Sequence, residues 1–347
     1  MKRVFGVDLG GTTIKFSIID QAGNFIDRWA IPTNTENGGA NIPGDIIESL
    51  KSKMATLFER GETVEAIGVG TPGPVSGDVV ECAVNLGWNN MPLGHLLQEG
   101  TGLPVTLLND ANAAALGEAW MGGDSAFRAS TVVFVTLGTG VGGGVIVDGK
   151  VLNGQHGCAG EVGHMPVMAA DARQCGCGKT NCLECYCSAT GFVKTANDLY
   201  EAAGDTRVYT EGKDVFDQVA AGDEIAIQAR DITVDYLARG LAAIMSTVDP
   251  QEVIVGGGLS HAGELLMGPL AEKLDEYVFP GTRGKYVLRR ATLGNDAGAL
   301  QRAGQGSAAL AVSLPCRYIH SGASVVQQSD IDATRALLAA LLPKLYD

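Results

Sequence analysis

The stretch VFGVDLGGTTIKFSIID, residues 4–20, contains an apolar run, a turn of adjacent glycines and threonines, and a second apolar run. This pattern predicts a strand, a tight glycine turn and a returning hairpin strand. The stretch TVVFVTLGTGVGGGVIVDG, residues 131–149, has the same three parts in the same order. The duplication is weak in sequence, but it predicts two related halves that each begin with the same hairpin.

Strands and helices are predicted to alternate around these hairpins. Apolar residues at helical spacing indicate a helix over 45–60. Buried strands are expected at 66–75 and 104–110, with a helix over 111–120 directly after the second of them. Another strand that runs into a glycine turn is expected at 251–260. This alternation predicts an α/β fold with a mostly parallel sheet in each half.

Composition and length limit the class of protein. A chain of 347 residues is long enough for two domains, which we expect at 1–120 and 121–298, packed closely around a cleft. With 46% hydrophobic and 18% charged residues, disorder is not expected. The net charge of −14 argues against a surface for nucleic acid or anionic membranes. With no signal peptide or membrane span predicted, we expect a cytoplasmic protein.

Three glycine turns are candidates for binding a nucleotide. Adjacent glycines let backbone N–H groups approach phosphate oxygens, threonine hydroxyls add donors, and Asp8 could hold the waters around Mg²⁺. A single turn of this kind could equally be a tight hairpin, but three in two duplicated halves resemble the sugar kinase/actin/heat-shock-protein superfamily, in which ATP lies between two related domains. The candidate residues are Asp8, Gly10, Gly11, Thr12, Thr13, Lys15, Gly138, Thr139, Gly140, Gly256, Gly257 and Gly258.

The motif LLNDANAAALGEA, residues 107–119, places Asp110 where a predicted strand meets a predicted helix. Phosphoryl transfer to an alcohol needs a carboxylate that takes the hydroxyl proton, and Asp110 is our candidate. Taken alone, this position is also typical of an aspartate that only caps a helix. Asn109 beside it could bond a neighbouring sugar hydroxyl.

Five of the eight cysteines lie between Cys175 and Cys187. Together with His164, the cysteines at 175, 177 and 182 form a set suited to tetrahedral Zn²⁺, with no ligand position left open. Such a metal would therefore be structural, and it would supply the folding energy of a loop that has few apolar residues. A disulfide loop and unrelated thiols are the alternatives. Reducing conditions and the short C-x-C spacing favour zinc.

These motifs resemble the ROK family of sugar kinases, and most closely its ATP-dependent glucokinases. The resemblance covers about residues 4–298 and rests on DLGGTT, TPGPV, NDANAAALGE, LGTGVGGG, GEVGH, the cysteine loop and LGNDAG. It implies a two-domain, actin-like ATPase (ribonuclease-H-like) fold in which Asp110 is the general base and His164 binds both zinc and sugar. The implied sugar contacts are Gly73, Asn109, Asp110, Glu161, His164 and Glu184.

The sequence departs from the family pattern in two places. Asn181 stands where the family usually has glycine, and asparagine tolerates the left-handed conformation that a turn glycine supplies. Cys185 and Cys187 are not expected ligands, although either could join a competing four-cysteine set. We therefore favour the family's ligands and leave the roles of Cys185 and Cys187 open.

The C-terminal segment 299–347 is atypical for the family. It resembles the end of glutamyl-aminopeptidase-like dinuclear metallopeptidases, in which the histidine matching His320 is a metal ligand. The other peptidase ligands are absent, so we expect a structural tail. Part of it should complete the N-terminal domain, and a helix that begins near Ser329 should pack against that domain or against a partner subunit.

We therefore predict an ATP- and Mg²⁺-dependent hexose kinase, with glucose as the favoured substrate and a homodimer or higher homo-oligomer as the expected assembly. Another hexose or an N-acetylhexosamine is the first alternative. A noncatalytic sugar-binding protein is the second. A sugar-sensing repressor of the same family would need an N-terminal DNA-binding domain, for which we see no room. Polyphosphate in place of ATP is disfavoured, because no basic tract is present.

Overall fold

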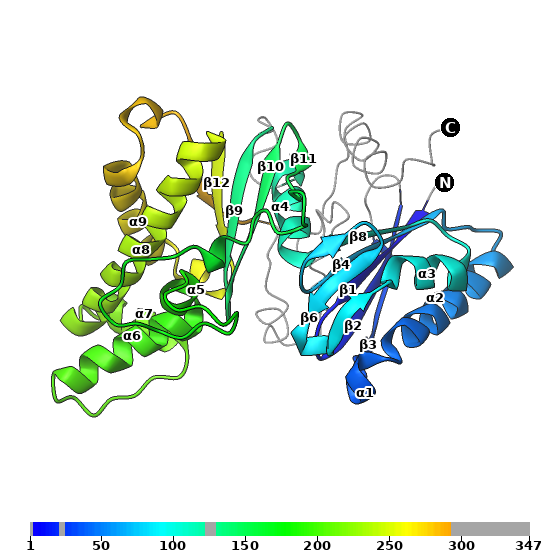
Figure 1. The fold of residues 1–347 in the computed structure, drawn as a ribbon, viewed down its shortest axis with the longest axis horizontal. Coiled ribbons are helices and arrows are strands. Elements are labelled where there is room, and N and C mark those ends of the chain that lie inside the picture. The colour runs from blue at the N-terminus through cyan, green and yellow to red at the C-terminus, as the bar shows by residue number, and fades with distance from the viewer. Residues whose placement is uncertain (1–2, 21–24, 122–129, 293–347) are drawn as a thin grey trace. The chain divides into compact units, whose positions relative to one another are not determined.

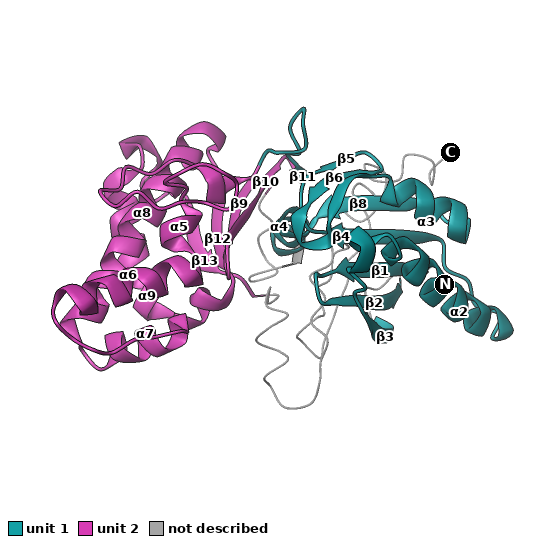
Figure 2. Ribbon diagram, turned by 60° about the horizontal axis from the view of Figure 1, so that its bottom comes forward, with its two compact units in different colours: residues 1–128, 149–159, 293–347 teal, residues 129–148, 160–292 magenta. Residues whose placement is uncertain are grey.

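The computed structural model describes residues 3–20, 25–121 and 130–292. The chain forms two compact units (Figure 2). Among the described residues, the first unit holds 3–20, 25–121 and 149–159, and the second holds 130–148 and 160–292. The segment 149–159, which the sequence analysis assigns to the second domain, therefore belongs to the first unit. The tail at 299–347, with His320 and the helix expected near Ser329, lies outside the described residues.

The first unit is built on a five-stranded sheet with the order β3-β2-β1-β4-β8 (Figure 1). Its strands are β1 (Arg3–Leu9), β2 (Thr13–Asp20), β3 (Phe25–Pro32), β4 (Ala66–Thr71) and β8 (Val105–Asn109). The strands from β3 to β1 are antiparallel, because they are joined by hairpins, whereas β1, β4 and β8 are parallel. The expectation of a mostly parallel sheet is therefore wrong. The sheet is evenly mixed, because the hairpins that the sequence predicts add two antiparallel pairs.

Helices and a small second sheet complete the first unit. The helices are α1 (Glu36–Gly39), α2 (Ile42–Glu59), α3 (Leu93–Thr101) and α4 (Asp110–Met121), and the small sheet has β5 (Val75–Ser76), β6 (Val79–Ala83) and β7 (Trp88–Met91). Apolar side chains of α2, such as Ile46 and Leu50, share one buried core with Phe5 and Val7 of β1. Burying this apolar face is what stabilises a helix against the sheet.

The second unit repeats the strand order of the first. Its sheet has the order β11-β10-β9-β12-β13, with β9 (Val132–Leu137), β10 (Val141–Val147), β12 (Glu252–Gly256) and β13 (Val287–Arg290). The edge strand of this sheet, β11 (Lys150–Val151), comes from the segment 149–159 that is grouped with the first unit. In both sheets the first strand of the hairpin pairs antiparallel with the second and parallel with a later strand. The duplication predicted from the two glycine-rich hairpins is therefore confirmed at the level of topology.

Helices pack together beside this sheet (Figure 1). They are α5 (Glu184–Cys187), α6 (Ala189–Ala202), α7 (Gly212–Ala220), α8 (Glu224–Val248) and α9 (Glu264–Tyr277), with short 3₁₀ turns at Val162–His164, Gly258–Ala262 and Pro280–Thr282. Asp223 caps α8 by accepting the N–H groups of Ile225 and Ala226. Among the helices of the described residues, none is both long and apolar enough to span a bilayer.

Candidate active site and cysteine loop

The first glycine turn joins β1 to β2 in the first unit. Gly10 donates its N–H to the Thr13 carbonyl at 3.1 Å, and a Cβ at this position would lie only 2.9 Å from the same oxygen. Asp8 and Lys15 face each other across the hairpin, with Lys15 Nζ 3.8 Å from Asp8 Oδ2. Burial lowers the pKa of Lys15, although the nearby Asp8 carboxylate opposes this. The turn therefore brings a buried ion pair next to backbone that only glycine can form.

Asn109 and Asp110 lie where β8 ends and α4 begins, as predicted. Asn109 Oδ1 accepts the N–H groups of Ala111 at 3.0 Å and of Asn112 at 3.2 Å, so this side chain caps the helix. Asp110 is the first residue of α4 and is exposed, and its Oδ1 also lies 2.7 Å from the Ala111 nitrogen. Asn109 is thus the main cap of α4. The capping role that the sequence also allows for Asp110 belongs mainly to its neighbour.

Gly73 is held directly beside this junction. Asn109 Nδ2 donates to the Gly73 carbonyl at 3.1 Å. Gly73 has a φ of +84°, and a Cβ there would lie 1.8 Å from the Cys82 carbonyl oxygen of β6. Only glycine can occupy this position. The structure therefore brings together three of the predicted site residues, Gly73, Asn109 and Asp110, in the first unit.

The second and third glycine turns lie against each other in the second unit. Strand β12 pairs with β9, and a Cβ on Gly257, whose φ is +83°, would lie 2.4 Å from the Leu137 nitrogen. The start of α6 holds the second turn, because Ala189 N–H donates to the Gly138 carbonyl at 2.7 Å and Thr190 Oγ1 to the Thr139 carbonyl at 3.1 Å. Two of the three predicted nucleotide-binding turns are therefore neighbours.

The cysteine loop gathers one histidine and three cysteines at one point. One ligand atom from each of His164, Cys175, Cys177 and Cys182 lies within 4.8 Å of all the others. The Cys177 and Cys182 sulfurs are 3.6 Å apart, as are Cys175 Sγ and His164 Nδ1. Tetrahedral zinc bonds would separate two sulfurs by about 3.8 Å and a sulfur from a nitrogen by about 3.6 Å. A disulfide would need about 2.0 Å, and every described cysteine is free. The disulfide alternative is therefore wrong.

The thiols of this cluster differ in their acidity. Burial raises the pKa of Cys175 to about 12 and also raises the pKa of Cys182, whereas the backbone N–H of Lys179 lowers the pKa of Cys177. A divalent cation between the sulfurs would reverse the effect of burial, because it deprotonates a coordinated thiol. The donor set fits a thiolate-bound metal ion.

Cys185 and Cys187 lie outside the cluster in the described part of the chain. The Cys187 thiol is fully buried, and it donates to the Thr233 carbonyl of α8 at 3.4 Å. The competing four-cysteine set is therefore not formed. Cys187 instead packs α5 against α8.

Two carboxylates lie next to the cluster: Glu161 precedes the first ligand in the chain, and Glu184 follows the last. Glu184 Oε2 accepts the Val141 N–H at 2.9 Å, and Glu184 Oε1 lies 3.8 Å from the Cys175 sulfur. Glu161 Oε2 lies 3.9 Å from Nε2 of His164, whose other nitrogen faces Cys175. His164 therefore faces a predicted metal ligand with one ring nitrogen and a predicted sugar contact with the other.

Comparison with known proteins identifies the chain. The ROK family pattern matches residues 4–313. The chain belongs to the ROK family. A glucokinase from Halalkalibacterium halodurans is 39% identical over 306 residues, which cover 85% of this chain and 92% of that protein. An N-acetyl-D-glucosamine kinase from Salmonella paratyphi A is 32% identical over 296 residues, 82% of this chain and 93% of that one.

A solved structure agrees with these relatives. The ROK family glucokinase from Streptomyces griseus, determined in complex with glucose and AMPPNP, superposes with a TM-score of 0.66 at 32% identity. The match covers 84% of this ROK protein and 95% of the other chain. The predicted α/β, actin-like fold class is therefore confirmed. The cleft between the domains stays a prediction.

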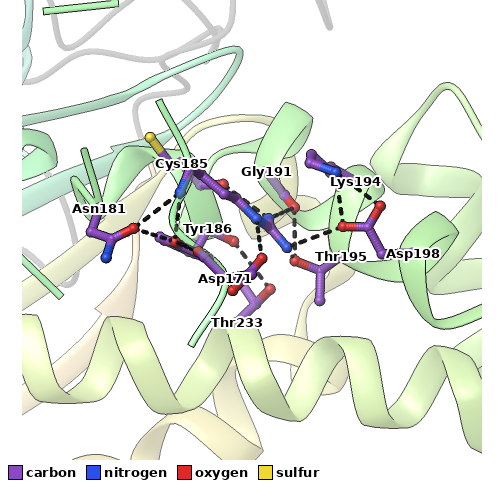
Figure 3. Close-up of polar contacts among 10 residues, drawn as sticks. Asp171, Asn181, Cys185, Tyr186, Gly191, Lys194, Thr195, Asp198 and Thr233 are labelled. Carbon is purple, nitrogen blue, oxygen red and sulfur yellow. Dashed lines mark hydrogen bonds and ion pairs between the residues drawn. The ribbon is translucent and has the colours of Figure 1, made fainter. Parts of the chain in front are cut away.

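Sequence analysis missed the polar network that supports the cysteine loop of this ROK protein (Figure 3). Asn181 does have the left-handed conformation expected of it, with a φ of +58°. Its side chain, however, also bonds the Tyr186 hydroxyl at 2.7 Å and the Arg173 N–H at 3.0 Å. The signal in the sequence was an arginine two residues before the first cysteine ligand, Cys175.

Proposed function

We propose that this ROK protein transfers the γ-phosphoryl group of ATP to the 6-hydroxyl of a hexose, with glucose as the favoured substrate. The observation that carries the proposal is the position of His164. Its Nδ1 faces Cys175, whose sulfur lies 3.8 Å from Glu184 Oε1, and its Nε2 faces Glu161. A histidine oriented by a metal on one side can present a fixed N–H to a sugar hydroxyl on the other.

Asp110 is the proposed general base. A carboxylate at the first position of α4 is stabilised in its charged form by the helix N-terminus. It would accept the proton of the 6-hydroxyl as that oxygen bonds to the γ-phosphorus and the bond from phosphorus to the β-phosphate oxygen breaks, which releases ADP. Asn109 already donates to Gly73 and caps α4. Asn109 therefore holds the Asp110 backbone in place and keeps one amide hydrogen for a sugar oxygen.

The glycine turns would bind the nucleotide. The N–H groups of Gly10 and Gly138 are bonded inside their own turns, and the other backbone N–H groups of Gly10–Thr13 and Gly138–Gly140 are suited to phosphate oxygens. The open backbone at Gly256–Gly258 is suited to the base. Mg²⁺ would neutralise the charge that develops on the phosphates. Asp8 could hold the waters of that ion, and its contact with Lys15 keeps the carboxylate in place.

Zinc is the metal that the cysteine loop fits. Three sulfurs and one imidazole nitrogen provide four ligands, and two pairs of them lie at tetrahedral separations, so no position would remain for a substrate. The ion would be structural. Its effect on substrate would come through His164 and through Glu184, which follows the ligand Cys182 closely in the chain.

A coupled kinase assay over a panel of sugars tests the proposal. The panel should contain glucose, mannose, allose and N-acetylglucosamine, with ATP and polyphosphate as donors. We expect ATP-dependent turnover that is highest with glucose. The highest turnover with N-acetylglucosamine would favour the chemistry named for the Salmonella relative. No turnover with any sugar would favour a noncatalytic sugar-binding protein, and calorimetry with glucose would then test the binding itself.

The remaining expectations are also proposals. We propose a cytoplasmic protein that forms a homo-oligomer, which sedimentation of the pure protein would test. We also propose that the tail, which resembles the end of dinuclear metallopeptidases, has no peptidase activity. His320→Ala should therefore leave the metal content and kinase activity unchanged. A loss of bound metal in that variant would show that the tail holds a metal ion.

A further inference from the structure

Arg173 lies two residues before Cys175, and its side chain is only 9% exposed. One guanidinium nitrogen, Nη1, lies 3.1 Å from the carbonyl oxygens of Cys185 and Gly191 and 3.0 Å from Thr195 Oγ1. This nitrogen has two hydrogens, so the three acceptors share them. Arg173 therefore bridges the end of the cysteine loop, the single-turn helix α5 and the first turn of α6.

The same guanidinium is held from its other sides. Nε lies 2.7 Å from Asp171 Oδ2, Nη2 lies 3.5 Å from Asp198 Oδ2, and Cζ lies 4.5 Å from the centroid of the Tyr186 ring. Figure 3 shows Asp171, Tyr186 and Asp198 converging on this point from three segments. A buried arginine is stable only when its donors are paired, and here each of its three nitrogens has a partner.

The backbone of Arg173 also closes the loop that bears the ligands. Arg173 N–H donates to Asn181 Oδ1 at 3.0 Å, and Asn181 N–H donates to the Arg173 carbonyl at 2.9 Å. The buried Tyr186 hydroxyl contacts both Asn181 Oδ1 and the Asp171 carbonyl. Because Cys182 follows Asn181 directly, a shift of Arg173 would move this ligand relative to Cys175.

Gly191 makes the bridge possible. A Cβ at Gly191 would lie 2.5 Å from the Cys185 carbonyl oxygen. Only glycine lets the first turn of α6 approach α5 this closely, and the approach brings both carbonyls within reach of one guanidinium. The Cys185 carbonyl lies in the single turn of α5, whose last carbonyls have no partner within the helix.

We propose that Arg173 and Gly191 form a positioning pair that fixes the ligand Cys182 and the proposed sugar contact Glu184 relative to the other three metal ligands. The pair thereby sets the retention of the metal and the affinity for the hexose. The part of this inference that concerns hexose rests on the proposed function. Neither residue touches a reacting atom. They act through Glu184, which directly precedes the Cys185 carbonyl that Arg173 bonds.

The test compares Arg173→Met, Arg173→Lys and Gly191→Ala with a matched control. Methionine keeps an apolar stem but has no donor, and lysine keeps the charge but cannot bridge several acceptors in fixed geometry. The control is Arg239→Met. Arg239 also lies over a tyrosine, with Cζ 4.6 Å from the Tyr277 ring, and its Nε lies 2.8 Å from Asp235 Oδ2. None of the described contacts of Arg239 reaches the cysteine loop.

Three measurements follow on zinc-loaded protein: the release of zinc to a colorimetric chelator, hydrogen exchange of the amides of residues 173–191, and the KM values for hexose and ATP. We expect Arg173→Met to release zinc about tenfold faster and to raise the hexose KM about tenfold, with the ATP KM within twofold. Arg173→Lys should show smaller changes in zinc release and hexose KM than Arg173→Met. Gly191→Ala should give the same changes in zinc release and hexose KM as Arg173→Met, and Arg239→Met should behave like wild type.

The outcomes separate this inference from the proposed function. If wild type phosphorylates no sugar, the kinase proposal fails, but zinc release and hydrogen exchange still decide the role of Arg173. If wild type binds no zinc, hydrogen exchange decides it alone. Unchanged amide protection over 173–191 in Arg173→Met, or equal losses in that variant and the Arg239→Met control, would overturn the inference.

Discussion

The carboxylate of Glu184 accepts the N–H of Val141 at 2.9 Å, although the two residues belong to the cysteine loop and to the second glycine turn. A Cβ on Gly140 would lie 2.3 Å from the same carboxylate oxygen. The proposed sugar contact and the proposed phosphate-binding turn are therefore tied by one hydrogen bond. The absence of a side chain at Gly140 leaves room for that bond.

This bond predicts that Glu184 influences both substrates. Glu184→Gln keeps an oxygen that can accept the Val141 N–H, so it should raise the hexose KM and leave the ATP KM within about twofold. Glu184→Ala removes the acceptor and should raise both KM values about tenfold or more, because a hydrogen bond to a charged group contributes about 1.5–3 kcal/mol. Steady-state kinetics with each substrate varied in turn measures this. An unchanged ATP KM in the alanine variant would contradict the coupling.

Asp110→Asn tests the general base. Asparagine preserves size and hydrogen bonding but cannot take the hydroxyl proton. We therefore expect turnover to fall by about 10²–10⁴-fold, while the ATP dissociation constant and the melting temperature stay near those of wild type. Single-turnover kinetics and calorimetry provide the two readouts. Turnover within a few-fold of wild type would mean that another group accepts the proton.

Cys177→Ser tests whether the cysteine loop binds zinc, with a cysteine variant from the same segment as the control. We expect about one zinc per chain in wild type and loss of most of it in the variant. The hexose affinity should then fall 10- to 100-fold, because the metal orients His164. Cys185→Ala is the control and should keep its zinc, since Cys185 lies outside the ligand cluster. Metal-free wild type that still binds glucose tightly would exclude a role for zinc.

Asn109→Ala should lower the free energy of unfolding by about 1 kcal/mol through loss of the α4 cap. It should lose somewhat more because the Gly73 carbonyl loses its donor. Asn109→Asp keeps an acceptor for the cap but has no amide to donate, so it should be less destabilised than alanine. Urea denaturation measures both. Equal losses in the two variants would show that the cap contributes little.

Asp223 predicts a pH dependence of stability. Burial alone would raise its pKa, but the hydrogen bond from the Ala226 N–H and the ion pair with Arg207 outweigh burial and lower it. A carboxylate with a lowered pKa contributes stability above its ordinary pKa near 3.8, and this contribution is lost as the pH falls through the folded-state value. Between about pH 5 and 2, Asp223→Asn should therefore lose less stability than wild type. The free energy of unfolding of both proteins should be measured across this pH range. An equal loss of stability in the two proteins would rule out this role.

The sequence by itself determined the repeated hairpins and the identity of the four metal-ligand candidates. Each depends on local chemistry that is visible in order along the chain: alternating apolar residues, glycines at forced turns, and closely spaced thiols. The left-handed backbone of Asn181 was predictable in the same way, because it depends on a single turn position.

Tertiary structure alone decided which groups these residues contact. The bond from Glu184 to Val141 joins segments 43 residues apart, and the bond from Arg173 to Gly191 joins segments 18 apart. No local pattern encodes such a pair, since it depends on how β10, α5 and α6 pack. The same holds for the return of 149–159 to the first unit and for the bond from Asn109 to Gly73, which are 36 residues apart. In each case long-range burial and hydrogen bonding selected one of several arrangements that the local sequence allowed.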